Sequence, residues 1–370
     1  MLGILGGGQL GAYFVVAART MGYRTMVLEP DATAPAGRVA DVHLVAGYDD
    51  AVALGRMAAE CAVVTTEFEN PPAASLTFLA ESTIVRPSAD VIAIAQDRRH
   101  EKHFLASLGV AVGPFAVIET DHHLSVHGIG FPAILKTARL GYDGKGQTTV
   151  HTDAELGDAW RSTGRVPCVL EQRLELSAEV SVVLARSPDG AIVCFPPAAN
   201  THVSGILDLS VVPAGHADTE AVAIAERIAI ALDYVGVLAV ELFVVQGELL
   251  VNEIAPRPHN SGHWTLDGAA TSQFEQQVRA VCGLGLGSSE LTASAAAMVN
   301  LLGDDWTPGE PTWAAALAHP GAHLHLYGKR DPRPGRKMGH LTVLAASPEL
   351  ATEGALTCRR DARRTVQLDH

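Results

Sequence analysis

Cysteine is scarce in this chain, and the few cysteines present are scattered. The 370 residues include five cysteines, and no two of them form a C-x-x-C pair. A disulfide scaffold and a cysteine-based zinc site both need denser or closely spaced cysteines, so the sequence argues against both classes. Free thiols of this kind are typical of the reducing cytoplasm, where we expect the protein to act.

Positive charge and long apolar runs are lacking as well. Lysine and arginine number 27 against 41 aspartates and glutamates, which gives a net charge of −14 at pH 7. That balance argues against a nucleic-acid partner, whose phosphates need a basic surface. No apolar run approaches the ~20 residues of a membrane-spanning helix, so we expect no membrane partner. The chain instead has 48% hydrophobic residues, a content typical of compact folded domains.

The order of the expected elements divides the chain into three parts. Up to about residue 95, short apolar strands alternate with helices, which predicts a Rossmann-like parallel sheet. Strands and glycine loops follow, and the stretch 285–289 is typical of a linker. We expect domains at 1–95, 96–290 and 291–370, the last one small and rich in strands. The individual predictions are strands at 2–5, 24–28, 39–45, 62–66, 133–136, 146–151, 168–172, 178–185, 191–196 and 292–302, and helices at 9–21, 49–60, 88–108 and 219–232.

A predicted hairpin carries the strongest chemical signal. Residues 237–251 read as two strands joined at Gln246-Gly247, a typical tight turn. A two-residue loop would place Glu241 opposite Asn252, and one extra loop residue would place it opposite Glu253. Either register brings two carboxylates together, which favours a cation between them. Oxygen ligands suit Mg²⁺, which binds through one or two carboxylates and substrate phosphates. The alternative is a surface hairpin with solvated acids.

The N-terminal glycines support a competing interpretation. The stretch Gly6-Gly7-Gly8-Gln9-Leu10-Gly11 follows a strand and opens a helix, and Glu29 closes the next strand. This pattern is the G-x-G-x-x-G fingerprint of dinucleotide-binding proteins. Any ligand that approaches a strand end and a helix N-terminus needs such glycines, however. The motif alone therefore does not identify NAD.

A second glycine loop follows a strand that ends in a lysine. Lys136 closes an apolar strand, and residues 141–147 read Gly-Tyr-Asp-Gly-Lys-Gly-Gln. The backbone amides of such a loop can fold over phosphates, next to the fixed charge of the lysine. The loop is not a P-loop, because G-x-x-x-x-G-K-[ST] is absent. The alternative is a glycine-rich hairpin turn with a solvated lysine.

Four motifs in this order resemble the ATP-grasp superfamily, and within it the N5-carboxyaminoimidazole ribonucleotide synthase family. They are Gly-Gly-Gly-Gln-Leu-Gly at 6–11, Thr-Glu-Phe-Glu-Asn at 66–70, the glycine loop at 141–147, and Asn-Glu-Ile-Ala-Pro-Arg-Pro-His-Asn-Ser-Gly-His-Trp at 252–264. The resemblance runs from the first motif to the segment 333–340. It implies an α/β and α+β multidomain chain: an ATP-grasp fold with an N-terminal Rossmann-like sheet and a small β-rich C-terminal domain.

The resemblance also implies roles for individual residues. The metal ligands would be Glu241 and Glu253, and candidate catalytic residues are Lys145, Arg257, His259 and Asn260. The ribonucleotide would contact Gln9, Leu10, Glu67, Tyr142 and Asp143, with Lys329 and Arg336 as a clamp on its 5′-phosphate. The ATP site would include Arg98, Lys136, Gly141, Tyr142, Asp143, Gly144, Lys145, Gly146, Gln147, Glu171, Gln172, Arg173, Leu174, Glu179, His202, Asn252 and Glu253.

The implied activity is that of a ligase that forms a C–N bond. Members of the family couple ATP, with Mg²⁺ as cofactor, to the carboxylation of aminoimidazole ribonucleotide by bicarbonate, through carboxyphosphate, in purine biosynthesis. We expect a homodimer. His259 is a candidate base for the reacting amine, and an oxygen of carboxyphosphate is the alternative.

Three other functions remain open at this point. A formate-using glycinamide ribonucleotide transformylase would share the phosphate and metal residues. An NAD-dependent dehydrogenase would rest on Gly6–Gly11 and Glu29. A regulatory nucleotide-binding protein would have no need of the complete set Lys136, Glu241 and Glu253.

Overall fold

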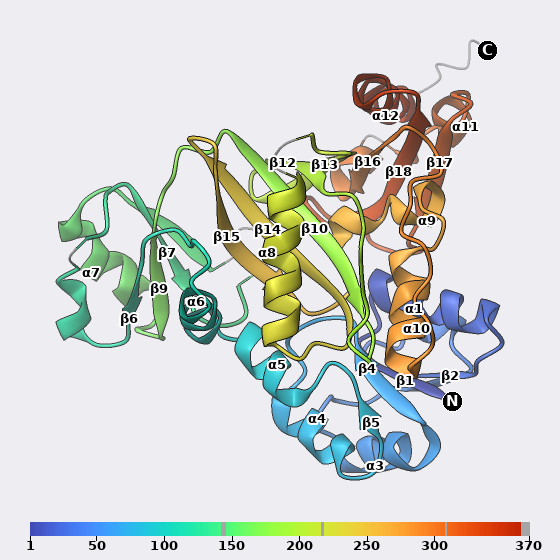
Figure 1. Ribbon diagram of the computed structural model, residues 1–370, viewed down its shortest axis with the longest axis horizontal. Coiled ribbons are helices and arrows are strands. Elements are labelled where there is room, and N and C mark those ends of the chain that lie inside the picture. Colours follow the sequence, from blue (N-terminus) through green and yellow to red (C-terminus); the bar gives the residue numbers. More distant parts are fainter. Residues whose placement is uncertain (127, 142–145, 216–217, 308, 364–370) are drawn as a thin grey trace.

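The computed structural model describes residues 1–126, 128–141, 146–215, 218–307 and 309–363. The described strands form three sheets of five, nine and four strands. Figure 1 shows the N-terminal unit and the C-terminal segment on one side of the molecule and the four-stranded sheet on the other, with the nine-stranded sheet between them. No helix of the described residues is long and apolar enough to cross a membrane.

The N-terminal unit is a parallel sheet in the order β3-β2-β1-β4-β5, as its alternating pattern predicts. Its strands are β1 (Leu2–Leu5), β2 (Thr25–Leu28), β3 (Val42–Leu44), β4 (Val63–Thr66) and β5 (Ile84–Val85), and its helices are α1 (Gln9–Thr20), α2 (Pro35–Val39), α3 (Ala51–Glu60) and α4 (Ala73–Ala80). The strand expected at 39–45 is shorter because Pro35 starts a short helix before it, a position that suits proline's fixed φ.

The single helix expected at 88–108 is wrong, because it is two helices. They are α5 (Ala89–Ala95) and α6 (Arg98–Ser107). Asp97 lies between them in an extended conformation, and its side chain accepts a hydrogen bond from the backbone N–H of Arg99. A carboxylate at this position caps a new helix, so the chain turns at Asp97 although no glycine or proline marks the break.

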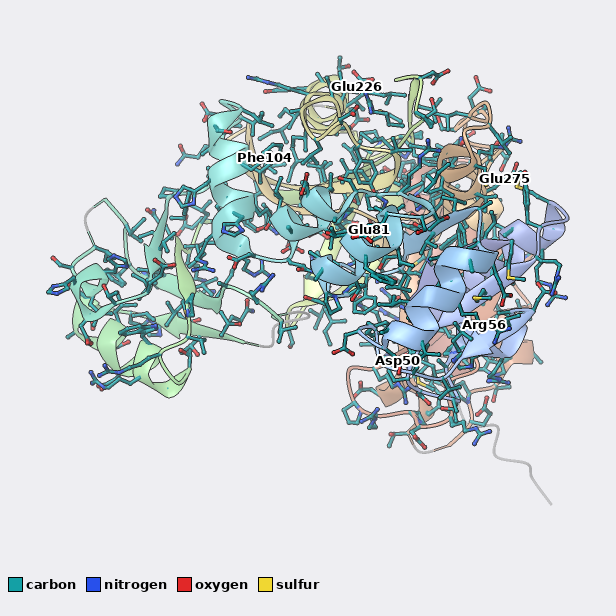
Figure 2. All side chains as sticks on the ribbon, turned by 90° about the horizontal axis from the view of Figure 1, so that it is seen from below. Asp50, Arg56, Glu81, Phe104, Glu226 and Glu275 are labelled. Carbon is teal, nitrogen blue, oxygen red and sulfur yellow. The ribbon has the colours of Figure 1, made fainter. Side chains whose placement is uncertain are left out.

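A small four-stranded antiparallel sheet stands apart from the rest of the molecule. Its order is β6-β9-β7-β8, and helix α7 packs on it. Its elements are β6 (Phe115–Ile118), the 3-10 helix η1 (Asp121–Leu124), β7 (Ala133–Thr137), β8 (Gln147–Val150), α7 (Asp153–Ser162) and β9 (Cys168–Gln172). The view in Figure 2 shows that α6, which carries Phe104, lies between this sheet and the body of the protein.

The central sheet follows the order β15-β14-β10-β12-β13-β16-β18-β17, and β11 pairs with β10. Its strands are β10 (Ala178–Arg186), β11 (Ile192–Cys194), β12 (Ala198–Val203), β13 (Ile206–Val212), β14 (Gly236–Val245), β15 (Glu248–Ala255), β16 (Ala295–Leu302), β17 (Ala322–Leu326) and β18 (Lys337–Ala345). Helix α8 (Asp218–Ala231) covers one face through Ala221, Ala225 and Ile228. The C-terminal strands thus continue this sheet, because β16 pairs with β13.

The remaining helices join the units. Helix α10 (Gln273–Cys282) packs through Val278 and Val281 against α1 of the N-terminal unit, and its Gln277 bonds the hydroxyl of Thr65 at 2.9 Å. The others are η2 (Asn260–Gly262), α9 (Thr265–Gly268), η3 (Gly303–Trp306), α11 (Trp313–Ala316) and α12 (Pro348–Ala362), the last of which covers β16 and β18.

Candidate active site

The predicted hairpin combines features of both registers left open by the sequence. Its turn has two residues, Gln246 and Gly247, with φ values of 51° and 87°, and Val245 pairs with Glu248. A β-bulge then shifts the register, so that Glu241 pairs with Glu253. The extra residue at the bulge is Asn252. Bulges of this kind re-aim side chains, and here the bulge brings the two carboxylates opposite each other.

Each of these two carboxylates has a separate hydrogen-bond donor. Arg98 Nη1 lies 2.9 Å from an oxygen of Glu253, and Nε2 of His259 lies 3.1 Å from an oxygen of Glu241. Burial alone would raise the pKa of Glu253, but Arg98 lowers it well below its usual value. Glu253 is therefore ionised at neutral pH.

A cavity of about 740 Å³ opens over this pair. It receives side chains from all three sheets, which makes it the place where they meet. The predicted residues that line it are Gln9, Leu10, Glu67, Arg98, Lys136, Gly141, Gln147, Arg173, Glu179, His202, Glu241, Asn252, Glu253, Arg257, His259 and Asn260.

The donor set in the cavity fits a hard cation such as Mg²⁺. The side-chain oxygen of Asn252 and both polar side-chain atoms of Asn260 are buried without a hydrogen-bond partner. Buried polar atoms of this kind normally have one. The side-chain oxygens of Asn252 and Asn260 and the carboxylates of Glu241 and Glu253 are all possible metal ligands. Oxygen ligands of this kind are the ones that Mg²⁺ prefers.

Two lysines, one buried and one partly buried, lie next to this carboxylate pair. The ammonium of Lys136 lies 3.0 Å from Glu171, and that of Lys102 lies 3.4 Å from the same oxygen. Lys102 also donates to the backbone carbonyl of Asn252 at 2.7 Å. Burial lowers the pKa of Lys136 in spite of Glu171. The site thus holds a desolvated positive charge where a phosphate could lie.

The N-terminal glycine loop is filled by the protein's own carboxylates. Glu67 accepts hydrogen bonds from the backbone N–H groups of Gly8 and Gly11, and Glu29 accepts one from Gly7. A Cβ atom at Gly6 or at Gly7 would lie 2.3 Å from Glu67 or Glu29, respectively. The glycines therefore admit carboxyl side chains, which occupy the backbone N–H groups that a pyrophosphate would need. The dinucleotide interpretation fails on this geometry.

Arg257 is held by a residue that the sequence analysis did not assign. Its Nε donates to Glu69 at 2.7 Å, and both residues line the cavity. Burial opposes both charges, yet Arg257 keeps the pKa of Glu69 below its usual value, and Glu69 raises that of Arg257. On the far side of the cavity, Glu179 pairs in the same way with His202 at 2.8 Å.

The remaining predicted residues either do not line the cavity or fall outside the described part of the chain. Tyr142, Asp143, Gly144 and Lys145 are outside the described residues. Lys102 and Lys136 hold the carboxylate of Glu171, and the side chain of Gln172 accepts from the backbone of Gly130. Those that do not line the cavity are Gly146, Glu171, Gln172, Leu174, Lys329 and Arg336.

The two predicted clamp residues nevertheless lie near the N-terminal unit. The charge of Lys329 lowers the pKa of Glu67, against the larger effect of burial, and that of Arg336 contributes to the lowered pKa of Asp31, which hydrogen bonds from Thr33 mainly cause. Arg38 also donates to the carbonyl of Gly328 at 2.7 Å. The C-terminal segment thus folds back over the N-terminal unit.

Four residues of the site escaped the sequence analysis: Glu69, Glu101, Lys102 and Lys337. Glu69 and Lys337 lie inside motifs that were recognised. Glu101 and Lys102 follow Arg98 at helical spacings of three and four, which place them on its face of α6. That spacing was a usable signal. The partners of these residues could not be predicted from the sequence. Lys102, for example, donates to the carbonyl of Asn252, which is 150 positions away.

Comparisons with known proteins agree with this geometry. Three family models match in turn: the ribonucleotide synthetase preATP-grasp domain at residues 1–96, the ATP-grasp domain at 103–274 and the phosphoribosylaminoimidazole carboxylase C-terminal domain at 296–354. The N5-carboxyaminoimidazole ribonucleotide synthase of Brucella melitensis is 44% identical over 92% of this chain and 95% of its own.

Solved structures of the same kind cover nearly the whole chain. The synthetase of Thermus thermophilus matches with a TM-score of 0.91 and 41% identity over 99% of both chains. The synthase of Aspergillus clavatus, in complex with ADP and 5-aminoimidazole ribonucleotide, matches with a TM-score of 0.87 and 27% identity over 98% of both. Shared sequence, domain order and fold thus coincide, and the chain belongs to the N5-carboxyaminoimidazole ribonucleotide synthase family of ATP-grasp proteins.

Proposed function

We propose that this protein is an ATP-dependent ligase that carboxylates 5-aminoimidazole ribonucleotide with bicarbonate, giving N5-carboxyaminoimidazole ribonucleotide, ADP and phosphate in purine biosynthesis. One observation carries the proposal: Glu241 and Glu253 face each other in a cavity that also contains Lys136 and the glycine loop with Glu67. The names of the relatives give the substrates, and the cavity has suitable groups for each of them.

The phosphates of ATP would lie between Lys136, Arg98 and the carboxylate pair. Glu241 and Glu253 would hold Mg²⁺, which when bound neutralises charge on the phosphate oxygens. Lys136 adds a fixed charge from the opposite sheet, and its desolvation strengthens its interaction with an anion. Arg98, which now pairs with Glu253, is free to turn to a phosphate once a cation takes that carboxylate.

Bicarbonate would be bound by Arg257. Its guanidinium can form two parallel hydrogen bonds with a planar oxyanion, which a lysine cannot. Nε of Arg257 donates to Glu69 and its Nη1 donates to the carbonyl of Pro258 at 3.2 Å, which leaves the other N–H groups of the guanidinium for the anion. Attack of a bicarbonate oxygen on the γ-phosphorus gives carboxyphosphate and ADP. Carboxyphosphate decomposes in water, so a site buried among three sheets protects it.

The ribonucleotide would lie over the N-terminal glycine loop. Gln9, Leu10 and Glu67 line that end of the cavity. Burial raises the pKa of Glu67, against hydrogen bonds from Gly11 and Gly8 that lower it. Its carboxyl oxygens can orient the substrate amine. Lys329 and Arg336, carried by the segment that folds back here, supply charges for the 5′-phosphate.

Three further points belong to this proposal. Mg²⁺ is the cation that the oxygen ligands suit best. The five cysteines are free thiols, which suits the reducing cytoplasm. A homodimer stays a prediction, and light scattering of the purified protein measures it.

The proposal is tested by ADP release from Mg-ATP. Release should require bicarbonate and 5-aminoimidazole ribonucleotide together, and omission of either should lower it to background. A parallel reaction replaces bicarbonate by formate and the ribonucleotide by glycinamide ribonucleotide. Turnover only in that second reaction would assign the protein to the formate-using ligases instead.

A further inference from the structure

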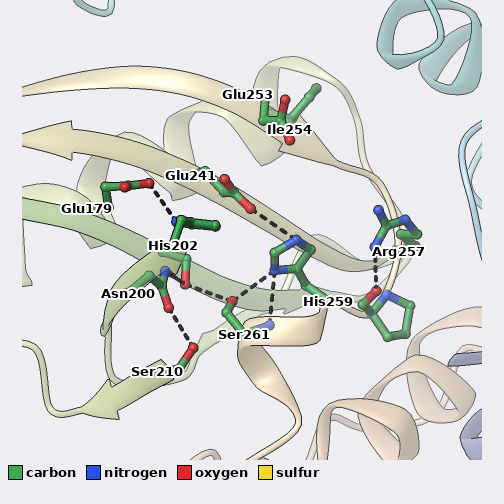
Figure 3. A network of polar contacts seen from close by, with 12 residues as sticks. Glu179, Asn200, His202, Ser210, Glu241, Glu253, Ile254, Arg257, His259 and Ser261 are labelled. Carbon is green, nitrogen blue, oxygen red and sulfur yellow. Dashed lines mark hydrogen bonds and ion pairs between the residues drawn. The ribbon is translucent and has the colours of Figure 1, made fainter. Parts of the chain in front are cut away.

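A chain of buried polar side chains runs beneath the metal pair and ends on His259. Ser210 donates to the side-chain oxygen of Asn200 at 2.7 Å, and the amide of Asn200 donates to Ser181 at 2.9 Å. Ser181 donates to Ser261 at 2.8 Å, and Ser261 lies 2.9 Å from Nδ1 of His259. Figure 3 shows this chain as a continuous row that leads to Glu241.

The sheet places these residues on one face, in two neighbouring cross-strand rows, because Asn200 pairs with Glu179, two residues from Ser181 on β10. Glu253, Glu241 and Ser181 pair across β15, β14 and β10, and Asn200 pairs with Ser210 across β12 and β13. Paired residues point to the same side of a sheet. The three serines are almost completely buried, so each must find its partners within the row.

One contact fixes the direction of the whole row. The backbone N–H of Ser261 donates to Nδ1 of His259 at 3.3 Å, as part of the cap of the 3-10 helix η2. A backbone N–H can only donate, so Nδ1 must carry a lone pair. The hydroxyl of Ser261, which accepts from Ser181, then donates to the same nitrogen. Nδ1 therefore receives two donors.

The opposite nitrogen must therefore carry the proton. Nε2 of His259 lies 3.1 Å from Oε1 of Glu241, and a lone pair there would face a carboxylate. We propose that Ser261 is a positioning residue: it holds His259 as the Nε2–H tautomer, which donates to Glu241 and so orients that carboxylate toward the cavity. This role rests on the proposed function in so far as Glu241 binds the metal.

In this assignment His259 is a hydrogen-bond donor and not a general base. Its Nε2 already carries a proton, and its Nδ1 points away from the cavity into the row of serines. The row itself cannot conduct protons, because the amide of Asn200 cannot pass one on. Partners that orient a metal ligand in this way contribute strongly to metal affinity. The bonded oxygen is Oε1, so Oε2 stays available to the cation.

Nitrogen-15 NMR of the histidines, in the full chain without nucleotide, tests the assignment. His259→Gln identifies the His259 signals by their loss. In the parent protein Nδ1 should be pyridine-like and Nε2 pyrrole-like. Ser261→Ala removes the shorter of the two donors to Nδ1, the hydroxyl at 2.9 Å, and keeps only the backbone N–H at 3.3 Å, so it should give a mixture of tautomers. Ser261→Thr should keep the parent pattern, and Ser75→Ala, a buried serine of α4, is the matched control. A pyrrole-like Nδ1 in the parent would overturn the proposal.

Metal dependence provides the second readout. Ser261→Ala should raise the Mg²⁺ concentration for half-maximal ADP release about 10-fold, while the KM for the ribonucleotide stays near the parent value. A parent-like tautomer pattern in Ser261→Ala would remove Ser261 from this role. If that variant does not fold, Ser261→Gly, which also lacks the hydroxyl, is used with the same expectations. Because the NMR pattern needs no turnover, a protein inactive with bicarbonate would refute the proposed function and leave the tautomer standing.

Discussion

At the scale of single residues, the site contains carboxylates that each accept a hydrogen bond from a basic side chain. Glu253 has Arg98, Glu241 has His259 and Glu69 has Arg257. Buried charges without partners are costly, and these pairs keep the cavity stable before any substrate arrives. In the proposed function, substrates and metal would exchange with these partners, so we expect a change at one residue to alter chemistry more than folding.

Glu253→Gln tests the metal pair. The amide keeps the shape of the side chain but removes one anionic ligand, so kcat for ADP release should fall about 1,000-fold. Glu248→Gln, an exposed change on the same hairpin, is the matched control and should be neutral. Circular dichroism checks the fold. A Glu253→Gln variant with parental turnover would remove Glu253 from the metal site.

Arg257→Lys tests the anion site. Lysine keeps the positive charge but cannot form two parallel hydrogen bonds. We expect kcat to fall between about 10-fold and 100-fold, with the KM for ATP little changed, in steady-state assays at saturating bicarbonate. A variant that loses ATP affinity instead would place Arg257 on the nucleotide.

At the scale of elements, local signals predict most of the structure and fail where distant contacts decide. The alternation of strands and helices predicts the parallel sheet, and the Gln246-Gly247 turn predicts the hairpin. The β-bulge at Asn252 could not be predicted from the sequence, because packing between the strands determines it. Asp97 lies in a polar run at 96–103 that contains no glycine or proline, and such a run is as compatible with one long helix as with two.

Asp97→Ala tests that helix start. Burial would raise the pKa of Asp97, but hydrogen bonds from Arg99 hold it below its usual value. Its folded pKa is thus below the unfolded one, so its stabilisation is present above about pH 4 and is lost as pH falls further. Asp97→Ala should lower the free energy of unfolding by about 1 kcal/mol at pH 7, and less at pH 3.

Thermal unfolding at both pH values measures this effect. Asp90→Ala, an exposed acid in the first turn of α5, is the matched control and should change the midpoint less. A loss that is equal at pH 7 and pH 3 would mean that the ionised carboxylate of Asp97 contributes nothing, and that only the backbone conformation matters.

At the scale of the whole molecule, the cavity exists because three sheets meet. The motifs of the sequence identify most of its lining, but they cannot show which residues meet across it. Glu69 and Arg257 are 188 positions apart, and nothing local to either one indicates the other. The continuation of the central sheet by β16 is equally non-local. The C-terminal segment then returns to the N-terminal unit through Arg38 and Gly328.

Arg336→Ala tests whether this return serves the ribonucleotide. Loss of a cation from a phosphate site should raise the KM for the ribonucleotide about 10-fold and leave that for ATP unchanged, because the clamp binds ground and transition states alike. Arg330→Ala, an exposed arginine of the same segment, is the control. An equal rise for both substrates would show that Arg336 holds the units together instead.

The central claim is that bicarbonate attacks ATP in this cavity, and the fate of one oxygen atom tests it most directly. Turnover with oxygen-18-labelled bicarbonate, Mg-ATP and 5-aminoimidazole ribonucleotide should place one labelled oxygen in each inorganic phosphate released, measured by mass spectrometry within a few turnovers. Attack by water would leave the phosphate unlabelled. Unlabelled phosphate, at a rate of ADP release that still depends on the ribonucleotide, would contradict the account.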